Sequence, residues 1–126
     1  MSPSERASQK PLHWVGSAKK DLLAFPEAVV DDFGYALGLA QQGGFPPSSR
    51  PWQGEGPGVF ELVEDFRGNT YRVAYTVRFE KAIYVLHCYQ KKSPSGIRTA
   101  RTDAALIRER LRIARADYEV RHGQKT

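Results

Sequence analysis

The fold of this 126-residue chain is decided by residues 59–90, which read VFELVEDFRGNTYRVAYTVRFEKAIYVLHCYQ. Three runs rich in β-branched and aromatic residues lie at 59–66, 70–79 and 82–90. They are separated by two short turn segments, Arg67-Gly68-Asn69 and Glu80-Lys81. Because such runs joined by short turns are typical of hairpins, the stretch predicts three neighbouring strands of an antiparallel sheet.

The alternation within these strands predicts which side chains share a face. Along 70–79, one face carries the aromatic and Val residues, and the other carries Thr70, Arg72, Ala74, Thr76 and Arg78. The run 82–90 is nearly all apolar, as expected of a central strand. By the same alternation, His87 and Tyr89 are expected on the face of Ile83 and Val85.

Helices are expected before and after this sheet region. Residues 12–16 predict a short first strand, and Ser17 then caps a helix that stops near Phe25 because Pro26 follows. Pro26 begins a second helix, which Gly43-Gly44 ends. The apolar stripe of that second helix comprises Val29, Phe33, Ala36, Leu37 and Ala40.

The remaining segments complete the predicted order. Residues 43–58 are rich in Gly and Pro and predict a long loop without regular structure. Residues 91–100 predict a basic loop, and Thr102 is the predicted N-cap of the last helix. The order β-α-α-β-β-β-α predicts an α+β fold, a small antiparallel sheet flanked by helices. We expect one domain over residues 12–120, a flexible lead-in at 1–11 and a polar tail at 121–126.

Composition narrows the class of protein. The chain is 40% hydrophobic and 26% charged, which is typical of a soluble globular domain. No run approaches the roughly 20 apolar residues that span a bilayer, so no membrane partner is expected. The single cysteine, Cys88, excludes an intrachain disulfide, and no zinc site or cofactor motif is present. A reducing, cytoplasmic location is the default expectation.

The net charge of +5 is unevenly distributed along the chain. Residues 21–66 hold eight acids and one base, a net of −7, whereas residues 67–98 hold seven bases and one acid, a net of +6. This polarity suggests that one side of the molecule binds a polyanion or an acidic partner. The alternative is a basic surface that only keeps the chain soluble.

Several motifs of the strands resemble a known family. The stretches ELVED (61–65), TYRVAY (70–75) and YVLHCYQKKS (84–93), with SGIRT (95–99) downstream, are similar to the RelE/ParE toxin superfamily. Within it they resemble the phage-derived HigB-like branch, over about residues 12–120. The segment from His87 to Ser93 together with SGIRT is the specific part of this resemblance.

The resemblance implies a RelE-like fold and the toxin of a type II toxin–antitoxin pair. HigB-like and RelE-like toxins enter the ribosomal A site and cut translated mRNA without a metal or small-molecule cofactor. Their partner is a helix-turn-helix antitoxin, which neutralises them. ParE-like toxins share the fold but act on gyrase, so a non-catalytic toxin is one alternative. An inactive phage relic that binds only its antitoxin is another.

Cations on the sheet would suit RNA cleavage, because they neutralise charge on the phosphorane. Arg72 matches the Arg of the family's Tyr-Arg motif, which contacts the scissile phosphate; the alternative is a salt bridge to Glu61 on the neighbouring strand. Arg67 in the turn is free to reach phosphates or is an ordinary turn residue. Lys91 and Lys92 resemble the family's basic pair at the end of the strand, where one of them would stabilise charge.

The remaining candidates for the chemistry are His87, Tyr89 and Glu61. His87 is either an acid or base or a hydrogen-bonded core residue. Tyr89 either stacks on a base or assists proton transfer, or it packs in the core. Glu61 is a general base only if its pKa suits that role, and the preferred interpretation is an ion pair that orients Arg72.

Other basic residues are candidates for RNA contacts. These are Arg50, Arg98 and Arg101. At the loop position where the family carries a basic-Pro-apolar-Lys-Gly run, this chain has Arg50 but Gln53 in place of the Lys, which puts catalytic strength in doubt more than fold. On the last helix, an arginine face at Arg108, Arg112 and Arg115 binds RNA or the antitoxin, or is simply solvated, which is the favoured interpretation.

Overall fold

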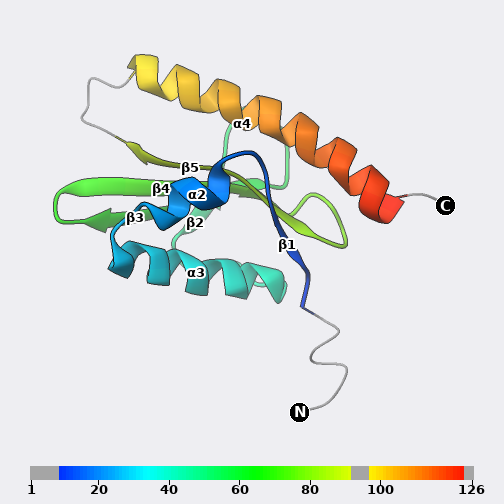
Figure 1. Cartoon of the computed structure of the whole chain (residues 1–126), viewed down its shortest axis with the longest axis horizontal. Helices are drawn as coiled ribbons and strands as arrows, with labels where there is room; N and C mark the ends of the chain where they lie inside the picture. Colours follow the sequence, from blue (N-terminus) through cyan, green and yellow to red (C-terminus); the bar gives the residue numbers. More distant parts are fainter. Residues whose placement is uncertain (1–8, 92–96, 124–126) are drawn as a thin grey trace, which may run out of the picture.

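The computed structural model describes residues 9–91 and 97–123, with the backbone alone for residues 97–101. The described chain forms three layers (Figure 1). Helices α2 (Ala18–Leu23) and α3 (Glu27–Gln41) cover one face of a mixed β-sheet, and α4 (Ile97–Tyr118) crosses the other face. A short π-helical segment, Glu119–Gly123, continues α4. The predicted α+β fold is confirmed.

The sheet has the strand order β1-β5-β4-β3-β2. Its strands are β1 (Leu12–Trp14), β2 (Ser49–Pro51), β3 (Val59–Phe66), β4 (Asn69–Thr76) and β5 (Ile83–Lys91). The predicted meander forms β3, β4 and β5, which pair antiparallel in sequence order. Between β3 and β4, Arg67 and Gly68 adopt φ angles of 53° and 82°. Positive φ at both central positions matches a type I′ turn, which suits the twist of the flanking strands.

Besides small shifts at the ends of several strands, three features of the fold differ from the prediction. The sheet is mixed, because β1 pairs with β5 in parallel. Part of the expected loop at 43–58 forms β2, which pairs with β3 and tolerates Pro51 because an edge strand has one unpaired side. Helix α4 begins at Ile97 rather than at Thr102. The segment between these residues holds no Gly or Pro that would stop a helix.

The core beneath α3 follows the predicted pattern. All five residues of the expected stripe are buried: Val29, Phe33, Ala36, Leu37 and Ala40. They pack against Leu62 of β3 and against Val73 and Tyr75 of β4. Pro26 caps the N-terminus of α3, and Gly43, with φ 92°, follows its C-terminus. The α2/α3 face of the sheet is therefore held by apolar packing.

A β-bulge in β5 changes the phase of that strand. Ala74 pairs with His87, but the next residue, Tyr75, pairs with Val85. Leu86 is thus an extra residue in β5. A bulge of this kind shifts the alternation of side chains by one position.

The bulge places His87 on the face opposite to the predicted one. Ile83 and Val85 belong to the core beneath α2 and α3. His87 instead contacts Asp103 of α4, and Tyr89 packs against the core beneath α4. The prediction that His87 and Tyr89 share a face with Ile83 and Val85 is wrong, because strict alternation does not hold across a bulge.

Candidate functional site

Glu61 is the centre of a polar cluster on the α4 face of the sheet. Its side chain is buried, and both carboxylate oxygens accept hydrogen bonds. Oε1 accepts from Arg72 Nη1 at 2.9 Å and from Arg50 Nε at 3.3 Å. Oε2 accepts from the Tyr89 hydroxyl at 3.1 Å. One carboxylate therefore joins side chains from β2, β4 and β5.

The register of the strands explains why these residues meet. Arg50 lies directly opposite Glu61, and Arg72 lies directly opposite Tyr89. Arg72 also pairs with Val63, which is two residues from Glu61, so Arg72 and Glu61 are diagonal neighbours on one face. Diagonal neighbours about 7–8 Å apart are within reach of long side chains. The contacts therefore follow from strand pairing and not from a mobile loop.

The part of the cluster formed by Arg50, Glu61 and Arg72 keeps a net positive charge. Two guanidinium groups share the one carboxylate of Glu61, which leaves a formal charge of +1. The Nε–H of Arg72 has no hydrogen-bond partner among the described residues. The side chain of Arg50 is 54% exposed, whereas that of Arg72 is 16% exposed. The cluster therefore combines an exposed guanidinium, that of Arg50, with a largely buried one, that of Arg72. This arrangement is suited to an anionic ligand.

His87 extends the cluster toward α4. Its ring stacks on Tyr89 with the ring centroids 4.7 Å apart and the planes at 13°. Its Nε2 lies 2.8 Å from Oδ1 of Asp103, and both residues are buried. Its Nδ1 is buried without a hydrogen-bond partner among the described residues. A continuous set of contacts thus runs from the exposed Arg50 to the first part of α4.

Burial, followed by the nearby carboxylate of Glu61, raises the pKa of the Tyr89 hydroxyl above its ordinary value. Tyr89 is therefore a neutral phenol at pH 7, and it donates its proton to Glu61 in a hydrogen bond. On the other side of β5, burial raises the pKa of the Cys88 thiol to about 12. That thiol is not a nucleophile at neutral pH.

The structure brings together one group of predicted residues and separates others from it. Those brought together are Arg50, Glu61, Arg72, His87 and Tyr89. Lys91 is exposed at the end of β5. Arg67 lies in the hairpin turn, where its guanidinium is 5.1 Å from the centre of the Phe66 ring. Arg67 lies four residues after Val63, which pairs with Arg72. Along the strand, Arg67 is therefore about 14 Å from the position of Arg72.

The remaining predicted residues lie outside what the structure describes. Lys92 falls in the segment between residues 91 and 97, which is not described. Arg98 and Arg101 lie in the first turns of α4, where the side chains are not described. Their proposed RNA contacts stay predictions.

Asp103 is the member of the cluster that sequence reasoning missed. In the sequence it follows Thr102, so it resembles an ordinary acidic residue in the first turn of a helix. Its contact with His87 depends on how α4 packs across β5. A buried carboxylate beside a histidine is a signal that only the tertiary structure provides.

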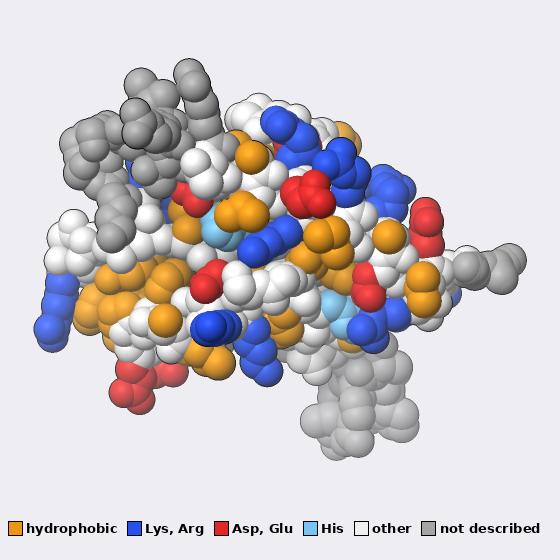
Figure 2. Space-filling view, turned by 45° about the horizontal axis from the view of Figure 1, so that its top comes forward, with side chains coloured by type: hydrophobic (Ala, Val, Ile, Leu, Met, Phe, Trp, Pro, Cys, Tyr) orange, Lys and Arg blue, Asp and Glu red, His pale blue; other side chains and the backbone are white. Residues whose placement is uncertain are grey.

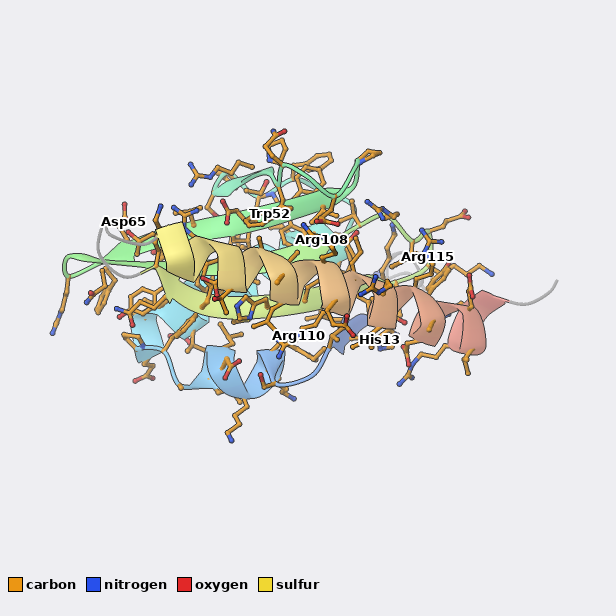
Figure 3. All side chains as sticks on the ribbon, turned by 90° about the horizontal axis from the view of Figure 1, so that it is seen from above. His13, Trp52, Asp65, Arg108, Arg110 and Arg115 are labelled. Atoms are coloured by element: carbon orange, nitrogen blue, oxygen red, sulfur yellow. The ribbon has the colours of Figure 1, made fainter. Side chains whose placement is uncertain are left out.

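The described arginine side chains of α4 mostly contact acidic or aromatic neighbours. Arg108 Nε contacts Glu55 at 3.1 Å, and Arg112 contacts Glu109 at 2.7 Å. On the surface seen in Figure 2, basic side chains are interspersed with acidic ones. Figure 3 shows Arg108 and Arg110 on opposite flanks of α4, Arg108 on the side of Trp52. These contacts favour a solvated, partly neutralised helix face over one continuous basic patch.

Within residues 9–91 and 97–123, no three or more His, Cys, Asp or Glu side chains are grouped so that they could hold a metal ion. No helix in this described part of the chain is both long and apolar enough to span a bilayer.

Comparisons with known proteins identify one family and one solved structure. The model of the family described as "Phage derived protein Gp49-like (DUF891)" matches residues 20–112. The toxin–antitoxin complex RelBE2 from Mycobacterium tuberculosis contains a chain that matches with 18% identity and a TM-score of 0.46. The match covers 68% of this chain and 94% of that one. No curated protein sequence matches significantly.

Proposed function

The chain belongs to the phage-derived Gp49-like family, and from this premise we propose that it is the toxin of a type II toxin–antitoxin pair. We propose further that it cuts translated mRNA in the ribosomal A site without a metal, in the cytoplasm. A helix-turn-helix antitoxin would neutralise it. The observation that carries the nuclease proposal is the cluster around Glu61, which joins two guanidinium groups to a tyrosine and a histidine on one sheet face.

The proposed reaction breaks one bond of the RNA backbone. The ribose 2′ oxygen attacks the adjacent phosphorus, and the bond from phosphorus to the 5′ oxygen breaks. A base takes the 2′ proton, cations neutralise the phosphorane, and the departing 5′ oxygen takes up a proton. The products are a 2′,3′-cyclic phosphate and a 5′ hydroxyl.

The residues of the cluster match these requirements. Arg72 and Arg50 would contact the phosphate, since guanidinium geometry suits phosphate oxygens. Glu61 holds both guanidiniums in place and would act as an orienting partner. His87 and Tyr89 would serve in proton transfer or in base stacking. Lys91 or Lys92, at the end of β5, would stabilise charge near the leaving oxygen.

Two residues outside the cluster would have secondary roles. Arg67, in the hairpin turn, would contact the RNA backbone away from the scissile bond. Gln53 is exposed at the position where the family carries a lysine. The loop next to β2 therefore has one positive charge fewer than in relatives that keep this lysine. We therefore expect weaker substrate binding than in relatives that keep the lysine.

Expression of the full chain in bacterial cells tests the proposal. Wild-type protein should arrest translation, and primer extension should show cuts within translated mRNA. Arg72→Ala should lower cleavage by roughly 10²–10³-fold, because it removes one charged contact to the transition state. Arg121→Ala is the matched control. It removes an exposed guanidinium that pairs with Asp117 at the far end of α4, and it should leave cleavage unchanged.

Each alternative function has its own result in this experiment. A DNA-damage response with intact mRNA would indicate a gyrase-type toxin. Absence of any growth phenotype would indicate a relic that only binds its antitoxin. An Arg72→Ala variant as toxic as the wild type would refute the phosphate contact. A stable complex with the helix-turn-helix protein encoded in the adjacent reading frame is expected in all three cases.

A further inference from the structure

Asp103 makes a buried contact with His87 that lies outside the proposed reaction. It lies in the first part of α4, sixteen residues after His87, and its Oδ1 is 2.8 Å from His87 Nε2. The relative exposures of His87 and Asp103 are 6% and 9%, so solvent competes little for this hydrogen bond. The partners come from different elements, β5 and α4.

The chemistry of the pair determines where the imidazole proton lies. An ionised carboxylate only accepts hydrogen bonds, so Nε2 must carry the proton that it donates to Asp103. In the neutral ring, Nδ1 then has a free lone pair. That Nδ1 is buried and has no hydrogen-bond partner among the described residues. The ring cannot turn freely, because it stacks on Tyr89.

We propose that Asp103 is a positioning residue that fixes the Nε2–H tautomer of His87 and so makes Nδ1 the proton acceptor in the cleavage reaction. The inference rests on the proposed nuclease function. Because Nδ1 is buried in the chain without RNA, substrate binding must uncover it. The 2′ hydroxyl proton then moves to Nδ1, and the electron pair of that O–H bond forms the new bond to phosphorus. The imidazolium that forms is stabilised by the Asp103 carboxylate. The electrons of the broken bond leave with the 5′ oxygen, which takes a proton from water, and the resulting hydroxide takes the proton of the imidazolium.

The tautomer also depends on the tertiary structure. Asp103 reaches His87 only while α4 is packed on β5. Ile107 and Leu111 of α4 are part of that packing, because both lie in the core beneath the helix. The acceptor atom of His87 is thus set by a helix that contributes no other member to the polar cluster among the described side chains.

The test compares the full-length wild type with Asp103→Asn. The asparagine has the same shape, but its amide group can donate to Nε2 and so favour the Nδ1–H tautomer. Long-range ¹⁵N–¹H correlation spectra of the His87 ring should show Nε2–H in the wild type and Nδ1–H in the variant. In ribosome assays, kcat should fall by roughly 10²–10⁴-fold while KM changes little.

Glu109→Gln is the control on the same helix, because Glu109 is exposed and pairs with Arg112. It should keep the wild-type spectrum and kcat. An Nδ1–H tautomer in the wild type, or Asp103→Asn with wild-type kcat, would overturn the role of Asp103. A wild type that cuts no mRNA would instead overturn the proposed function, while the tautomer spectrum decides the contact independently. Equal unfolding temperatures of the variants exclude loss of folding as the cause.

Discussion

The two faces of the sheet are built from residues of the same strands, yet they differ in kind. The face beneath α2 and α3 is an apolar core that includes Phe33, Leu62 and Tyr75. The face beneath α4 is apolar around Leu86 and Ile107 but polar around Glu61. Apolar burial stabilises a fold without specifying chemistry, whereas a buried polar cluster requires every partner to be in place. The face beneath α2 and α3 therefore serves stability, whereas the face beneath α4 serves stability through its apolar part and carries the candidate site in its polar part.

The largest effect should come from breaking the apolar face. Phe33→Ala removes a side chain that is 1% exposed, so it should lower the free energy of unfolding by about 3–5 kcal/mol. Urea denaturation measures this. Cleavage per folded molecule should stay at the wild-type level. Tyr35→Ala on the same helix is the control, because Tyr35 is 73% exposed and its loss should change stability by less than about 0.5 kcal/mol.

A smaller loss of stability, together with a loss of activity, should follow from breaking the polar face. Glu61→Gln removes the carboxylate that Arg50, Arg72 and Tyr89 share. Hydrogen bonds to a charged group are worth about 1.5–3 kcal/mol, so we expect a destabilisation in this range. Cleavage should fall as well, since Arg72 is no longer held. If Glu61→Gln lowered stability but left cleavage intact, the polar cluster beneath α4 would have a structural role and no role in cleavage.

The smallest effect concerns a polar pair on the α3 face. Burial, then the neighbouring Asp32, raises the pKa of Glu64 from its ordinary 4.5 to about 7. The folded chain therefore keeps this proton up to about pH 7, whereas the unfolded chain releases it near pH 4.5. The contribution of Glu64 to stability is fully present below pH 4.5 and is lost as the pH rises to about 7.

Urea midpoints measured between pH 4 and 8 test this expectation. The wild type should lose stability relative to Glu64→Gln as the pH rises through that interval, and the difference should level off above it. The effect should be small, because Glu64 is only half-buried and Asp32 is exposed. Parallel pH curves for the two proteins would show that Asp32 and Glu64 do not interact in solution.

Much of the fold was predictable because it rests on local patterns. The α3 stripe was predicted residue by residue, since a period of 3.6 places Val29, Phe33 and Leu37 on one side of any helix. The bounds of β3 matched the prediction for the same kind of reason. The family was also readable from motifs, and its confirmation rests on the match over residues 20–112.

The candidate site was predictable only in part. Arg72 and Glu61 were expected on neighbouring strands, and their ion pair is present. The pairing of Arg50 with Glu61 depends on β2, which has no strand signal in a segment rich in Gly and Pro. The orientation of His87 depends on a bulge at Leu86, and nothing in the run YVLHCY distinguishes a bulged strand from a regular one.

The sequence by itself determined the family, the meander and the residue types available for chemistry, because these follow from neighbouring residues and their spacing. Only the tertiary structure decided that Glu61 joins two arginines and that Asp103 meets His87. Those contacts join segments far apart in the chain. They depend on strand register and on the position of α4, which are set by the packing of whole elements against one another.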